Sequence, residues 1–122
     1  MKKKKRPLSA LRRDLDKLFS LFIRRRDALP NGMGRCFTCN RYSLLEAGHF
    51  IRRQHVATRW DERNVHGQCA YCNRWQHGAQ AEYYVELVKK YGQATVDELM
   101  QLKRTPTRFN RDDYEKMLER FR

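Results

Sequence analysis

The chain has 122 residues and a mass of 14.8 kDa, which indicates one small domain. It carries 27 lysine and arginine residues against 14 aspartate and glutamate residues, so its formal net charge is +13. The mean hydropathy of −0.94 and the charged fraction of 34% exclude an integral membrane protein. The apolar share of 40% argues against wholesale disorder.

This positive charge favours a polyanionic partner, of which nucleic acid is the first candidate. Residues 1–7 are predicted to form a basic flexible tail, and no secretory signal follows them, so we expect the protein to act in the cytoplasm. The alternative for the charged runs is a solvated surface without a ligand. The residues expected to contact DNA phosphates are Lys2, Lys3, Lys4, Lys5, Arg6, Arg24, Arg25, Arg26, Arg52 and Arg53.

A single domain is predicted over residues 8–122, in three parts. Residues 8–28 are predicted to form an N-terminal helix, because leucine and phenylalanine recur there at steps of three and four. Residues 31–92 are predicted to form the core of the domain, and within it residues 31–72 hold all four cysteines and little helical periodicity, which indicates irregular or short-strand structure organised around something other than an apolar core. Residues 94–122 are predicted to form the C-terminal helices.

Local signals set the expected helix boundaries. A helix from about Asn73 should bury Tyr84 and end at Gly92, which suits a helix C-terminus. Thr95 is predicted to open a short helix as part of a capping box, and Asn110 to cap the last helix.

The four cysteines form two C-x-x-C motifs, Cys36 with Cys39 and Cys69 with Cys72. Two intervening residues let both thiolates of a tight turn face one ion, and four sulfur ligands suit tetrahedral Zn²⁺. Disulfides, a redox pair or an iron–sulfur cluster are the alternatives. We expect a closed structural zinc site that holds the fold and takes no part in chemistry.

Histidine and asparagine residues follow in a characteristic order between and after these motifs: Gly48-His49, Asn64, Asn73 and then His77. The segments IRRRDALPNGMGRCFTCN, EAGHFIRR, TRWDERNVHGQCAYCN and YYVELVKKYG carry a family likeness. With them, the chain resembles the NinG/Rap recombination nucleases of lambdoid phages, within the HNH or His-Me finger superfamily. The resemblance covers about residues 15–100.

The resemblance implies an α+β fold with a small zinc-stapled ββα-metal core and flanking helices. In such a core the first strand delivers His49, the second strand runs near residues 65–68, and a helix begins at about Asn73. His49 matches the general base, and Asn64 matches the asparagine that ties a loop to the strand and orients this histidine. Asn73 matches a ligand of the catalytic divalent ion, and His77, one helical turn later, is expected to be a second ligand.

These residue types suit phosphodiester hydrolysis. A neutral imidazole can take a proton from water near pH 7, and an amide oxygen is a hard ligand for Mg²⁺ or Mn²⁺. The expected function is therefore a metal-dependent DNA endonuclease. The resemblance narrows its substrate to branched recombination intermediates, Holliday junctions or D-loop-like DNA, in the host-cell cytoplasm. A homodimer would match the two-fold symmetry of a four-way junction.

Two departures from the family pattern keep an alternative open. Gly48 stands where many HNH enzymes carry a metal-binding aspartate, and Ala79 stands where NinG-like sequences tend to have asparagine. The alternative function is a non-catalytic, zinc-containing DNA-binding module, for which the charge and the cysteines suffice.

Overall fold

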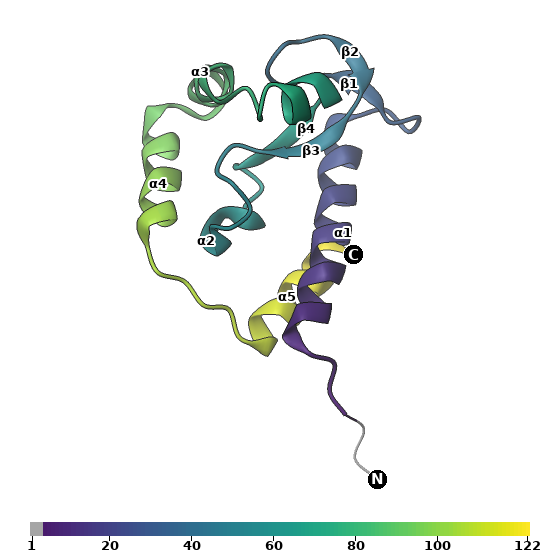
Figure 1. The fold of residues 1–122 in the computed structure, drawn as a ribbon, viewed down its shortest axis with the longest axis vertical. Helices are drawn as coiled ribbons and strands as arrows, with labels where there is room; N and C mark the ends of the chain where they lie inside the picture. The colour runs from purple at the N-terminus through teal and green to yellow at the C-terminus, as the bar shows by residue number, and fades with distance from the viewer. Residues whose placement is uncertain (1–3) are drawn as a thin grey trace.

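The computed structural model describes residues 4–122, which form a mixed helical and stranded fold of the predicted α+β class. Two small antiparallel sheets are present, β1 with β2 and β3 with β4. Figure 1 shows α1 and α5 on one side of β3 and β4, with α3 and α4 on the other side. The elements are α1 (Leu8–Asp27), β1 (Met33–Arg35), β2 (Tyr42–Leu44), β3 (Glu46–His49), α2 (Val56–Arg59), β4 (Val65–Gln68), the π-helical turn η1 (Tyr71–Trp75), α3 (Gln80–Tyr91), α4 (Gln93–Arg104) and α5 (Arg111–Phe121).

Helix α1 confirms the predicted N-terminal helix to within one residue. Leu11, Leu15, Phe19 and Ile23 recur along one face and are all buried. They pack against α5 and against strands β3 and β4, so α1 covers one face of this two-stranded sheet. Within residues 4–122, none of the helices has the length and apolar character needed to cross a membrane.

The β3–β4 hairpin contains both strands that the sequence analysis expected. Its register pairs Glu46 with Gln68 and His49 with Val65. Successive side chains of a strand point to opposite faces. Ala47 and His49 therefore face α1, whereas Glu46 and Gly48 face the turn η1.

The continuous helix expected from about Asn73 is wrong. The chain forms one π-helical turn, η1, and then breaks before α3 begins at Gln80. His77, Gly78 and Ala79 have φ angles of 51°, 89° and 50°, in the left-handed region that ends a right-handed helix. The break also changes which face of the following helix is buried: Tyr83 is fully buried, whereas Tyr84 is exposed.

The C-terminal helices follow the prediction in part. Helix α4 begins at Gln93, directly after Gly92 with its φ of 90°, and no side chain caps it, so the capping box expected at Thr95 is wrong. Helix α5 is capped by Asn110 as predicted. Its side chain accepts from the backbone N–H of Asp113, and the Asp113 carboxylate accepts from the N–H of Asn110 in return.

Candidate functional site

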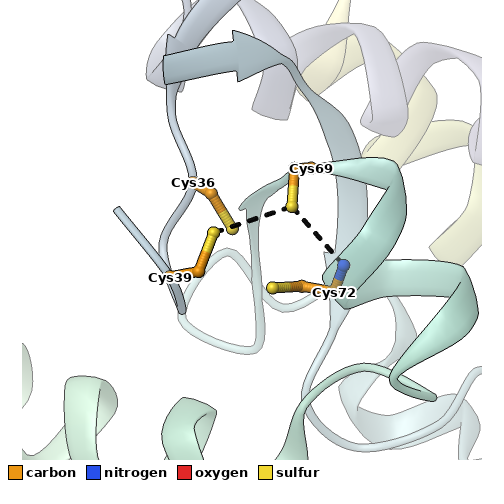
Figure 2. A group of neighbouring side chains, drawn as sticks. All are labelled: Cys36, Cys39, Cys69 and Cys72. Atoms are coloured by element: carbon orange, nitrogen blue, oxygen red, sulfur yellow. Dashed lines mark hydrogen bonds between the residues drawn. The ribbon is translucent and has the colours of Figure 1, made fainter. Parts of the chain in front are cut away.

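The two C-x-x-C motifs come together beside the β1–β2 hairpin and the end of β4. The sulfur atoms of Cys36, Cys39, Cys69 and Cys72 lie within 4.8 Å of one another and point toward a common centre (Figure 2). The Sγ atoms of Cys39 and Cys69 are 3.7 Å apart, far longer than a disulfide bond. Zinc–sulfur bonds of about 2.3 Å in a tetrahedron give a sulfur–sulfur separation of about 3.8 Å, so the donor set fits structural zinc.

The protonation of these thiols also fits a bound cation. Burial raises the pKa of the Cys72 thiol to about 12. Burial also acts to raise the pKa of Cys36, but hydrogen bonds from the Thr38 hydroxyl and from backbone amides outweigh it and lower that pKa to about 6. A zinc ion stabilises coordinating sulfurs in their deprotonated form. A zinc ion bound here would let the four crowded sulfurs exist together as thiolates.

His49 ends strand β3 with its ring mostly shielded from water. Its Nε2 lies 2.9 Å from the backbone carbonyl oxygen of Arg59, which can only accept, so Nε2 carries the proton. Nδ1 is then left with a free lone pair. Burial, together with the positive charges of Arg53 and Arg59, lowers the pKa of His49 to about 4. The imidazole is therefore neutral at pH 7 and can accept a proton at Nδ1.

The imidazole opens onto a cleft of about 360 Å³ between α1 and β3. We call this the His49 cleft. Three of its side chains are cationic, Lys17, Arg24 and Arg53, and they surround a neutral base. A phosphate group entering it would meet positive charge on several sides. The full lining is Asp16, Lys17, Phe19, Ser20, Arg24, Ala47, His49 and Arg53.

Asp16 ties α1 to the segment that orients this histidine. Its carboxylate accepts hydrogen bonds from Arg59 Nε at 3.1 Å, Arg53 Nη2 at 2.7 Å and Trp60 Nε1 at 3.0 Å. Burial opposes ionisation of Asp16, but the hydrogen bonds and charges of Arg59 and Arg53 outweigh it and lower its pKa. Since the carbonyl of Arg59 bonds the imidazole, Asp16 acts on His49 through Arg59.

Asn64 is fully buried and bridges two segments of backbone. Its Oδ1 accepts from the N–H of Ile51 at 2.8 Å, and its Nδ2 donates to the carbonyls of Ile51 at 3.1 Å and Thr58 at 3.0 Å. These bonds hold the chain just after β3 against the residue that precedes Arg59. This geometry suits the loop-tying part that the resemblance implies for Asn64.

Asn73 and His77 do not join His49 in this cleft. Asn73 Nδ2 donates to Glu46 Oε1 at 2.9 Å, and Glu46 faces the side of β3 opposite to His49. His77 is exposed and lies in the left-handed segment between η1 and α3, so it does not share a helical face with Asn73. In the described part of the chain, the cysteines are the one group of three or more His, Cys, Asp and Glu side chains close enough to hold an ion.

Side-chain packing explains why residue 48 is a glycine. A Cβ atom added there would lie 1.9 Å from Oε1 of Gln68, so an aspartate at this position would displace that side chain. Gln68 is itself fixed, because its Nε2 donates to the Thr38 hydroxyl and to the carbonyl of Gly78. Gly48 and Gln68 therefore form a matched pair, and Gln68 occupies the space that a carboxylate on residue 48 would take.

The residues expected to bind DNA differ in their exposure and in their bonding partners. Lys2 and Lys3 lie outside the described residues. Lys4 and Lys5 are exposed ahead of α1, where Arg6 pairs with Asp14. Arg24 and Arg53 line the His49 cleft, and Arg25 and Arg52 are exposed. Arg26 is different, because its guanidinium donates to the backbone carbonyls of Glu62 and Val65 and holds α1 against β4.

Comparison with known proteins assigns the chain to a family. A family model described as "Bacteriophage Lambda NinG protein" matches residues 1–122. The chain belongs to the NinG family. Among curated relatives, the protein ninG of Escherichia phage 933W is 39% identical over 82 residues, and those of Escherichia phage lambda and Salmonella phage P22 are 38% identical over 82 residues. No solved structure matches the chain.

These matches cover 64% of this NinG-family chain and 38% of each relative, so the matched region spans well under half the length of the curated relatives. Lys17 and Arg59 belong to the site without having been singled out from the sequence, and so do Asp16 and Glu46. No local signal marks Asp16 or Glu46: Asp16 has the same setting along the sequence as Asp14, and only the packing of α1 against the loop separates them.

Proposed function

We propose that this NinG-family chain is a DNA endonuclease that hydrolyses phosphodiesters in branched recombination intermediates, Holliday-junction or D-loop-like DNA. One observation carries the proposal: the neutral imidazole of His49, held by the Arg59 carbonyl, opens onto a cleft lined by cationic side chains. The branched character of the substrate comes from the resemblance to the NinG/Rap nucleases. The host-cell cytoplasm as the place of action and a homodimeric state stay predictions.

The residues of the cleft suggest how the reaction would run. Arg24 and Arg53 would hold a phosphate through charge-assisted hydrogen bonds. Nδ1 of His49 would take a proton from water as the water oxygen attacks phosphorus and the 3′-oxygen leaves. The bond from Nε2–H to the Arg59 carbonyl keeps the ring in the correct tautomer. An anionic phosphate beside the ring raises its pKa from about 4 toward the working pH, which makes it a stronger base.

The expected catalytic ion, Mg²⁺ or Mn²⁺, lacks a complete protein ligand set among the described residues. The amide of Asn73 donates to Glu46, His77 is exposed outside the helices, and Gly48 offers no side-chain ligand. Such an ion would stabilise charge on the phosphate oxygens. Adding either ion to the cleavage reaction tests whether it is required.

The deciding experiment compares cleavage of branched and linear DNA by the wild type and by His49→Ala, with Mg²⁺ or Mn²⁺. Loss of the general base should reduce cleavage by about 10²- to 10⁴-fold. DNA affinity should not change, because the proposed phosphate contacts are made by arginines and not by the imidazole. Zinc content should not change either, because the imidazole bonds the Arg59 carbonyl and not a cysteine. His55→Ala is the matched control, since His55 lies outside the His49 cleft. Equal cutting by the wild type and His49→Ala would contradict the proposal.

One observation favours the alternative, a non-catalytic zinc-containing DNA-binding module. The residues expected to bind the catalytic ion are not assembled around His49. A wild-type protein that binds branched DNA and cuts neither branched nor linear DNA with either ion would support this alternative.

A further inference from the structure

Two aromatic side chains of the turn η1, Tyr71 and Trp75, are exposed to solvent. Trp75 is 75% exposed, the highest value among the large apolar side chains of the described residues, and Tyr71 is 47% exposed. Indole rings are strongly buried on average, so a tryptophan with this exposure is unusual, and it shares its turn with a second exposed aromatic ring. Trp60, the other tryptophan, is buried in the core beside α1 and α5.

The turn that carries these rings is firmly held. It contains Cys72, a member of the four-cysteine cluster, and the N–H of Cys72 donates to the sulfur of Cys69. Gln76 Nε2 donates to the hydroxyl of Tyr71 at 2.8 Å, which fixes the phenol ring. A surface fixed in advance loses little conformational entropy when a ligand binds. Single π-helical turns are also concentrated at functional sites.

Cationic side chains flank the two rings. The guanidinium carbon of Arg41 lies 5.3 Å from the centroid of the Tyr71 ring. Arg74 comes from the same turn, and its side chain is 70% exposed while it is anchored by Glu46. Aromatic faces with arginines beside them match a nucleic-acid strand, in which flat bases alternate with anionic phosphates.

We infer that Tyr71 and Trp75 form a stacking surface for unpaired bases of a DNA strand, with Arg41 and Arg74 on its phosphates. The inference rests on the proposed function for its choice of DNA. Paired bases are covered on both faces by their neighbours, so this surface distinguishes DNA that contains unpaired bases from a continuous duplex. The turn contacts Glu46, on the face of β3 opposite to His49, so the stacking surface selects substrate and takes no part in the chemistry.

Binding of oligodeoxythymidine and of a duplex of equal length tests the inference, without added Mg²⁺ or Mn²⁺. Trp75→Ala should weaken oligodeoxythymidine binding by about 5- to 100-fold, the usual effect of removing one stacked aromatic ring. Trp75→Phe should retain most of the affinity, and duplex binding should stay the same because phosphate contacts carry it. Tyr84→Ala, an exposed tyrosine of α3, is the control and should bind both DNAs as the wild type does. Unchanged binding by Trp75→Ala, or an equal loss for duplex, overturns the inference.

Tryptophan fluorescence gives a second measurement. Oligodeoxythymidine should quench the tryptophan fluorescence of the wild type. This quenching should disappear in Trp75→Phe, because the remaining tryptophan, Trp60, is only 6% exposed and cannot contact a base. The two proposals can fail separately. A protein that binds through Trp75 but does not cut DNA contradicts only the nuclease, and one that cuts D-loop-like DNA, which carries an unpaired strand, equally well with and without Trp75 contradicts only the stacking surface.

Discussion

The four-cysteine cluster and the His49 cleft are assembled from very different stretches of chain. Each half of the cluster is a C-x-x-C turn, and joining the two turns completes it. The His49 cleft takes Asp16 and Arg24 from α1, His49 from β3 and Arg53 from the loop that follows. A site made of short motifs can be identified whole in a sequence, whereas for a site made of side chains from separate elements the sequence shows single residues such as His49 and not the partners that hold them.

The two regions also differ in what holds them. With zinc bound, the four cysteines would themselves hold the cluster together, because metal binding and folding are coupled. The His49 cleft depends on hydrogen bonds made by the residues that position the imidazole. The Arg59 carbonyl bonds the ring, and Asp16 and Asn64 hold Arg59 and its neighbour Thr58 in place. Damage to the cluster should therefore affect the whole fold, and damage to the cleft should affect function first.

The largest expected effect is that of Cys39→Ser. Structural zinc contributes about 10–16 kcal/mol of binding free energy, comparable with the whole stability of a small domain, about 5–15 kcal/mol. The variant should lose zinc and unfold the region from β1 to η1. Zinc content by mass spectrometry and circular dichroism measure both effects.

Ser43→Ala is the control for this substitution, because the Ser43 hydroxyl bonds only the carbonyl of its neighbour Leu44. It should keep its zinc and its stability. A Cys39→Ser protein that is folded and free of zinc would show that the cluster does not hold the fold.

Asp16→Asn should damage the cleft and leave the cluster intact. The amide cannot satisfy the guanidinium groups of Arg53 and Arg59, and we expect a loss of about 1–3 kcal/mol in the free energy of unfolding. Under the proposed function, a displaced Arg59 carbonyl should also lower the cleavage rate by about 10- to 100-fold. Urea denaturation and cleavage kinetics measure the two losses.

Asp14→Asn on the same helix is the matched control. Asp14 pairs with Arg6 in solvent, so its removal should change neither stability nor cleavage measurably. If both variants behave alike, Asp16 does not position the histidine through Arg59.

Acid should weaken the packing of the first C-x-x-C turn and of α3 against strand β4. His66 of β4 stacks on Phe37 of the first C-x-x-C turn, with ring centroids 4.1 Å apart, and its ring nitrogens pair with the hydroxyls of Tyr83 and Tyr91. Burial lowers the pKa of His66 to about 3, below the value of about 6.5 in an unfolded chain. Between these values the unfolded state binds more protons, so stability falls as the pH falls through this window.

His66 should account for about 1.4 kcal/mol of unfolding free energy per pH unit below about pH 6.5. Urea denaturation at pH 7 and pH 5, with zinc content followed in parallel, measures this slope. His66→Gln should be less stable at pH 7 and have a shallower slope, with the remainder contributed by His49 and by protonation of the four cysteines as zinc is released. An unchanged slope in that variant would mean that His66 is not buried in its neutral form.

The predictable part of the structure is the part with strong local signals. The apolar repeat in α1, the Asn110 cap of α5 and the paired C-x-x-C motifs each specify their structure over a few turns of chain. The helix expected from Asn73 failed because its apolar repeat resumes only after a break. Left-handed backbone at His77 and Ala79 has no reliable sequence signature, since such conformations are held by their surroundings.

The sequence by itself determined the α+β class, the four sulfur ligands and the histidine at the end of a strand. Only the tertiary structure decided which face of the hairpin that histidine occupies, that Asp16 and Arg59 orient it, and that Asn73 turns to Glu46 instead. The physical reason is the range of the interactions. Periodicity, caps and ligand pairs act between near neighbours in the chain, whereas the partners of Asp16 lie more than thirty residues away and meet it only when α1 packs against the strands.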